Sequence, residues 1–116
     1  GTAALPHDSL KAEIAMKLVR DKIPDIIRET GAEPDVTVAM GSVYLELLGR
    51  KMGEELEEYM EEPSYEEAAD MLEVFRALVA YHGLDLDEIE RVRVQKHLER
   101  GGFESGAVLW GVAGDE

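Results

Sequence analysis

The chain has 116 residues, of which 45% are hydrophobic, so it has enough apolar material for one core and we expect a single domain rather than a disordered acidic tail. Its 26 Asp and Glu residues outnumber 12 Lys and Arg residues, and the formal net charge of −14 argues against binding to nucleic acid or anionic membranes. The sequence contains no cysteine, which excludes a disulfide scaffold, a thiolate zinc site and thiol catalysis. No apolar run is long enough to span a membrane and no export signal is recognisable, so we expect a cytoplasmic protein.

The N-terminal part of the chain divides at Met16. We expect residues 1–15 to be a leader, either native or added by an expression vector, because Met16 can itself be an initiator methionine. A single domain is then expected over residues 16–116. Its first stretch is basic and contains Lys17, Arg20 and Lys22. Pro24 favours the first turn of a helix that ends at Gly31, and residues 32–41 predict a loop or a short strand.

Three long helical patterns make up most of the remainder, over residues 42–62, 64–82 and 85–100. Ser42 is the expected N-cap of the first, and Ser64 and Asp85 each begin a capping box for the helices that follow. The links are short, which predicts antiparallel neighbours. The predicted fold class is therefore all-α, an antiparallel helical bundle. From about residue 103 the chain predicts an arm that packs on a partner subunit.

Some acidic residues of the first long helix fall on its apolar face. With about 100° per residue, Glu55 lies about 20° from Leu48, inside a stripe formed by Leu48, Met52, Leu56 and Tyr59. Glu58 and Glu62 lie along the edge of this stripe. Three further acids, Glu54, Glu57 and Glu61, are expected on the solvent side. Only the inward acids need a special explanation.

The second long helix is apolar around most of its circumference, so we expect it to be the most buried element. Two acids interrupt its apolar surface. Glu67 falls between Val74 and Leu78, and Asp70 falls between Ala77 and Tyr81. Both carboxylates are therefore predicted among apolar side chains.

A divalent cation would reconcile these inward carboxylates with burial, since unpaired buried carboxylates repel one another and are costly. Residues three apart on a helix are neighbours, so Glu55 with Glu58, and Glu67 with Asp70, can converge on ions. Oxygen-only ligands favour Mg²⁺ or Mn²⁺. The alternative is that the acids lie there by chance or pair with one of three arginines, Arg76, Arg91 or Arg93.

The motifs together resemble the MazG-like and phosphoribosyl-ATP pyrophosphohydrolase-like family of all-α nucleotide pyrophosphohydrolases. The resemblance spans residues 16–109 and rests on Glu55-x-x-Glu58, Glu67-x-x-Asp70, the segment from Lys17 to Pro24 and the segment from Lys96 to Phe103. It implies hydrolysis of a nucleoside triphosphate between the α and β phosphates, with Mg²⁺ held by the four acids. It also implies a homo-oligomer, either a dimer or a tetramer.

The resemblance gives the basic residues a use as ligands of phosphate oxygens: Lys17, Arg20, Lys22, Lys96 and Arg100. Ordinary salt bridging is the alternative for all five. Glu54 is the nearest candidate for a general base but has no assigned role, and Glu62 and Glu73 are further candidates around the metal.

Eight residues separate Glu58 from Glu67, fewer than in the longer MazG arrangement. The subfamily, and with it the substrate, is therefore not specified by the motifs. Removal of noncanonical or excess nucleotides is the leading interpretation. Phosphoribosyl-ATP hydrolysis in histidine synthesis is a second. A non-catalytic acidic helical module for oligomerisation or protein binding is a third.

Overall fold

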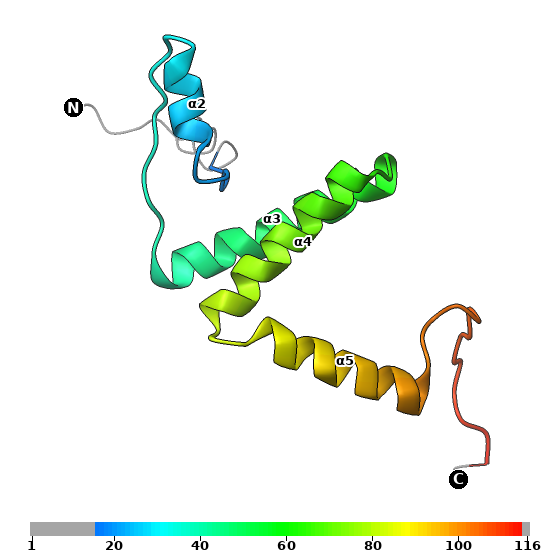
Figure 1. Cartoon of the computed structure of the whole chain (residues 1–116). Coiled ribbons are helices and arrows are strands. Elements are labelled where there is room, and N and C mark those ends of the chain that lie inside the picture. The colour runs from blue at the N-terminus through cyan, green and yellow to red at the C-terminus, as the bar shows by residue number, and fades with distance from the viewer. Residues whose placement is uncertain (1–15, 115–116) are drawn as a thin grey trace. The chain divides into compact units, whose positions relative to one another are not determined.

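The computed structural model describes residues 16–114, which form four α-helices and no strand (Figure 1). The helices are α2 (Ile23–Glu29), α3 (Gly41–Glu61), α4 (Tyr65–Tyr81) and α5 (Leu86–Arg100). The predicted all-α class is confirmed for this part of the chain. Between α2 and α3 the backbone is irregular, so of the two expectations for residues 32–41 the loop is correct. The predicted leader, residues 1–15, lies outside the described residues.

The helix ends follow local backbone chemistry. Pro24 lies in the first turn of α2, where backbone N–H groups make no hydrogen bond within the helix, so the lack of an N–H in proline costs nothing there. The Ser64 side chain accepts a hydrogen bond from the Glu67 backbone N–H at 3.1 Å, and Asp85 accepts one from Glu88 at 3.0 Å, so both predicted N-caps are confirmed. The predicted Ser42 cap is wrong, because the N-cap lies two residues earlier, at Met40, which takes the extended N-cap conformation without a side-chain hydrogen bond.

The chain divides between His82 and Gly83 into two compact units, and α2, α3 and α4 belong to the first. Only three residues link α3 to α4, and the two helices pack side by side as an antiparallel hairpin (Figure 1). The buried apolar residues of the unit are Leu47, Leu48, Val74 and Val79. At the open end of the hairpin, the rings of Tyr44 and Tyr81 meet edge to face with centroids 5.9 Å apart.

Two expectations about the hairpin are wrong. Leu56, placed by periodicity in the buried stripe of α3, is 47% exposed, and Leu72 on α4 is 57% exposed. Leu56 lies about 80° around α3 from the buried Leu48, at the edge of the face that meets α4. Leu72 is exposed because α4 faces α3 along the line of Val74, about 160° around the helix from Leu72. The expectation that α4 is the most buried element fails for the same reason, since one side of it faces outward. The acids Glu67 and Asp70 lie on the inward line instead.

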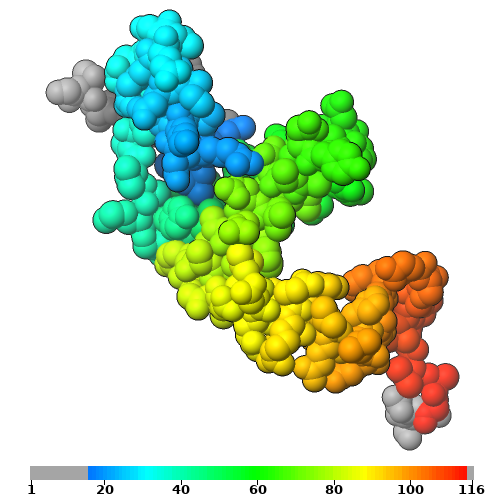
Figure 2. Space-filling model, viewed as in Figure 1, coloured from blue at the N-terminus to red at the C-terminus, as the bar shows by residue number. Residues whose placement is uncertain are grey.

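The second unit consists of α5 and the residues that follow it. Helix α5 ends at Gly101, whose φ of 81° is a left-handed conformation that favours glycine. The arm after it contains no helix or strand up to residue 114, and Phe103 and Trp110 are 98% and 94% exposed. Figure 2 shows the arm, in orange to red, leaving the end of α5. Within residues 16–114, no helix combines the length and the apolar character needed to cross a membrane.

Candidate metal centre

Three carboxylates from the two helices of the hairpin converge. Glu55 comes from the second half of α3, and Glu67 and Asp70 come from the first half of α4. One oxygen from each lies within 4.8 Å of the other two. The antiparallel hairpin produces this meeting, because the end of α3 and the start of α4 are adjacent on either side of a short link. Three of the four predicted acids are thus brought together.

The cluster is partly withdrawn from water. Glu55 is only 5% exposed, on the same face of α3 as Leu48. One oxygen of Glu55 and one of Glu67, Oε2 in both, are buried and have no hydrogen-bond partner among the described residues. Buried polar atoms of folded proteins are nearly all partnered, so these two oxygens are unusual, and either a proton or a cation would satisfy them. The donor set, oxygen only, suits Mg²⁺ or Mn²⁺.

The electrostatics of the cluster favour protonation when no cation is bound. The pKa of Glu55 is raised, chiefly because burial disfavours its charged form, with a further contribution from Glu58 and partial compensation by Lys51. The pKa of Glu67 is also raised, again first by burial and then by the charge and hydrogen bonding of Glu58. Carboxylates held together against this repulsion would gain from a shared cation.

Glu58, the fourth predicted acid, is exposed and is not among the three whose oxygens converge. It lies on the edge of the inward face of α3, as the helical angles predict. Its charge nevertheless raises the pKa of both Glu55 and Glu67, so it is electrostatically part of their surroundings.

Lys51 is a neighbour that the sequence reasoning missed. Its ammonium Nζ lies 3.3 Å from Glu55 Oε1 and 3.6 Å from Glu54 Oε2, and the lysine side chain is 27% exposed. The i,i+3 and i,i+4 spacing on α3 was the available signal. Glu54 was expected to face solvent, but its side chain is only 34% exposed where it pairs with Lys51. Glu54 lies outside the inward cluster, as expected, and it lines a small hollow together with Met16, Lys17 and Leu18.

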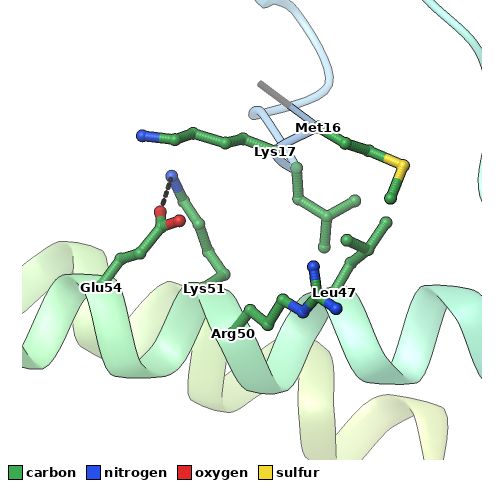
Figure 3. A pocket seen from close by; sticks show the side chains of 7 residues that line it. Met16, Lys17, Leu47, Arg50, Lys51 and Glu54 are labelled. Carbon is green, nitrogen blue, oxygen red and sulfur yellow. Dashed lines mark ion pairs between the residues drawn. The ribbon is translucent and has the colours of Figure 1, made fainter. Parts of the chain in front are cut away.

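Of the three predicted phosphate ligands near the N-terminus, only Arg20 contacts a residue of the acidic cluster. Arg20 Nη2 lies 2.6 Å from Asp70 Oδ1, and Arg20 Nη1 lies 3.8 Å from Glu73 Oε1, so this arginine already has carboxylate partners. The hydrogen bond to Asp70 is the main reason that the pKa of Arg20 is raised. Lys17 lines a small hollow on α3 that Lys51 and Glu54 also line (Figure 3), and Lys22 is the exposed N-cap residue of α2.

The remaining candidates are not among the three acids whose oxygens converge. Lys96 and Arg100 lie on α5 of the second unit, where both are exposed. Glu62 follows the last residue of α3 and is exposed, and Glu73 is exposed on α4 next to Arg20. The predicted roles of these four residues therefore stay predictions.

No protein-family model, curated protein or solved structure matches the chain. The function is therefore inferred from the site itself and from the motifs that form it.

Proposed function

We propose that the protein is a Mg²⁺-dependent nucleoside triphosphate pyrophosphohydrolase of the MazG-like type, which cleaves between the α and β phosphates and removes noncanonical or excess nucleotides in the cytoplasm. The observation that carries this proposal is the convergence of Glu55, Glu67 and Asp70 within 4.8 Å, with two buried oxygens left unpartnered. The ordered motifs of the resemblance support the same reaction.

In the proposed site, Glu55, Glu67 and Asp70 hold the metal, with Glu58 as the adjacent fourth ligand. Bound Mg²⁺ would neutralise the phosphate chain, orient it and lower the pKa of the attacking water. Water attacks the α-phosphorus, the bond from that phosphorus to the bridging oxygen breaks, and pyrophosphate leaves. The protein holds its carboxylates in place through the hairpin, whose helix start at Glu67 is fixed by the Ser64 cap.

The proposal includes assembly as a homo-oligomer, a dimer or a tetramer, in which the helices complete an antiparallel bundle. Exposed apolar side chains in the hairpin support it: Val43, Leu56, Met60 and Leu72 are between 47% and 69% exposed. In the second unit, Leu98 and Trp110 are 79% and 94% exposed. Surfaces of this kind favour burial against another chain.

The test is pyrophosphate release from a panel of canonical and modified nucleoside triphosphates and phosphoribosyl-ATP, with Mg²⁺, with Mn²⁺ and with EDTA. We expect metal-dependent release from at least one compound, and its loss in the Glu55→Gln and Asp70→Asn variants. Glu57→Gln is the matched control, because Glu57 is an exposed glutamate of the same helix outside the cluster. No release from any compound would reject the proposal in favour of the non-catalytic module.

A further inference from the structure

The segment that precedes α2, residues 16–22, contacts both helices of the hairpin, and we call it the strap. Its first three residues line the small hollow on α3 together with Leu47 (Figure 3), and Leu18 is half-buried there. Two residues further on, the strap reaches α4, because Arg20 Nη2 lies 2.6 Å from Asp70 Oδ1. The strap therefore joins α3 to α4 beside the acidic cluster.

The contact of Arg20 with α4 is electrostatic. Besides the hydrogen bond to Asp70, Arg20 Nη1 lies 3.8 Å from Glu73 Oε1. The pKa of Arg20 is raised chiefly by the hydrogen bond to Asp70, and the negative charge of Glu55 contributes as well. The guanidinium thus supplies positive charge to the acidic cluster while no metal is bound.

Arg20 and a metal ion would compete for the same carboxylate. Asp70 is one of the three acids whose oxygens lie within 4.8 Å of one another. A divalent cation held by those oxygens would lie close to the guanidinium, and two cations at short range repel. The Arg20 and Asp70 side chains are 55% and 38% exposed, so solvent weakens their ion pair and the metal can displace the arginine.

We propose that metal binding releases the strap: Arg20 holds the strap on Asp70 in the metal-free protein, and a divalent cation bound by the three carboxylates displaces Arg20 from α4. The inference rests on the proposed function and adds its regulation, since occupancy of the metal site is coupled to the position of the segment before α2. The coupling is reciprocal, so a docked strap weakens metal binding by the factor by which the metal weakens docking.

The strength of the ion pair determines how much of the strap is docked. A partly exposed pair of this kind shifts an equilibrium by up to about fivefold. Because metal affinity is reduced in proportion to the fraction of molecules with a free Asp70, a two- to fivefold reduction corresponds to roughly 50–80% docking without metal. Saturating Mg²⁺ should bring the docked fraction close to zero.

Electron paramagnetic resonance of the full chain measures the docked fraction. The sequence contains no cysteine, so Val19→Cys, at an exposed position next to Arg20, gives a single attachment site for a nitroxide. Spectra in EDTA and in saturating Mg²⁺ separate slow from fast label motion. Arg20→Gln in the labelled chain removes the contact. Arg28→Gln is the matched control, because its partners Asp25 and Glu33 are not among the converging acids.

We expect a slow component in EDTA for the labelled parent and for Arg28→Gln, and its disappearance in Mg²⁺. Arg20→Gln should be fast in both conditions. Glu55→Gln, which lacks one metal ligand but keeps the Arg20 contact, should retain the slow component in Mg²⁺, and this separates displacement from screening by salt. Calorimetric titration with Mg²⁺ establishes that the metal is bound.

The proposal would be overturned by a slow component that persists once Mg²⁺ is bound, by identical spectra of Arg20→Gln and its parent in EDTA, or by a parent that binds no Mg²⁺. Nucleotide hydrolysis is measured separately. Hydrolysis without release of the strap would overturn the inference and keep the proposed function. Release of the strap by Mg²⁺ in a protein that hydrolyses no nucleotide would reject the proposed function and keep the inference.

Discussion

Replacing Glu55 with glutamine should make the metal-free protein more stable while removing its response to Mg²⁺. Glu55 is 5% exposed and its Oε2 is buried without a partner. An unsatisfied buried polar group costs about 1–3 kcal/mol, and a partly exposed ion pair such as that with Lys51 offsets at most about 1 kcal/mol. The amide of the variant keeps the shape, carries no charge and can donate to Glu67 or Asp70.

At neutral pH the expected gain for Glu55→Gln is about 1–2 kcal/mol, or roughly 4–16 °C in Tm for a unit of this size. The sign of the pH dependence follows from the raised pKa of Glu55. The folded wild type binds a proton more readily than the unfolded chain, so its stability is greatest below the ordinary carboxyl pKa and falls as the pH rises through the raised value. The advantage of the variant should therefore vanish near pH 4.

Thermal unfolding in EDTA and in millimolar Mg²⁺, between pH 4 and pH 8, measures both effects. Mg²⁺ should raise the Tm of the wild type and of Glu57→Gln, and leave that of Glu55→Gln unchanged. The reasoning would be refuted if Glu55→Gln were less stable than the wild type in EDTA at pH 7. It would also be refuted if Mg²⁺ raised the Tm of Glu55→Gln as much as that of the wild type.

Three further predictions concern the surroundings of the cluster. Arg20→Gln should tighten Mg²⁺ binding by roughly two- to fivefold, because Asp70 then has no arginine competing with the metal. Arg28→Gln is the control and should leave Mg²⁺ affinity unchanged. Calorimetric titration with Mg²⁺ measures the affinity of both variants. Since ligands must be deprotonated and two carboxyl pKa values are raised, Mg²⁺ affinity should fall below those values by up to about tenfold per pH unit for each carboxyl, which titrations at pH 7.5, 6.5 and 5.5 would detect. Ser64→Ala should destabilise the hairpin by about 1 kcal/mol, seen by circular dichroism as a Tm lower by roughly 4–8 °C.

Helical periodicity was sufficient to predict the inward acids. The sequence placed Glu55 in the Leu48 stripe and Glu67 beside Val74, and these angles depend only on the regular rotation of a helix. The caps at Ser64 and Asp85 were equally predictable, because a capping bond spans three residues. Once the hairpin closes, these local features bring the acids of α3 and α4 together.

Contacts distant in sequence were not predictable in this way. The pair of Arg20 with Asp70 joins residues 50 positions apart, and nothing in the local pattern of either residue selects the other. The exposure of Leu56 was not predictable either, because periodicity identifies an apolar arc but not which part of a broad arc meets the neighbouring helix. The ion pairs of Lys51 with Glu54 and Glu55, by contrast, follow the i,i+3 and i,i+4 spacing of a helix and are predictable from the sequence.

The most direct test of the account is a ³¹P NMR assay of the wild-type protein with Mg²⁺ and the triphosphate that the panel selects. Cleavage between the α and β phosphates predicts that the three triphosphate signals are replaced by those of a nucleoside monophosphate and pyrophosphate, and that EDTA prevents the change. Appearance of a nucleoside diphosphate with orthophosphate, or turnover that continues in EDTA, would contradict the proposed metal-dependent pyrophosphohydrolase.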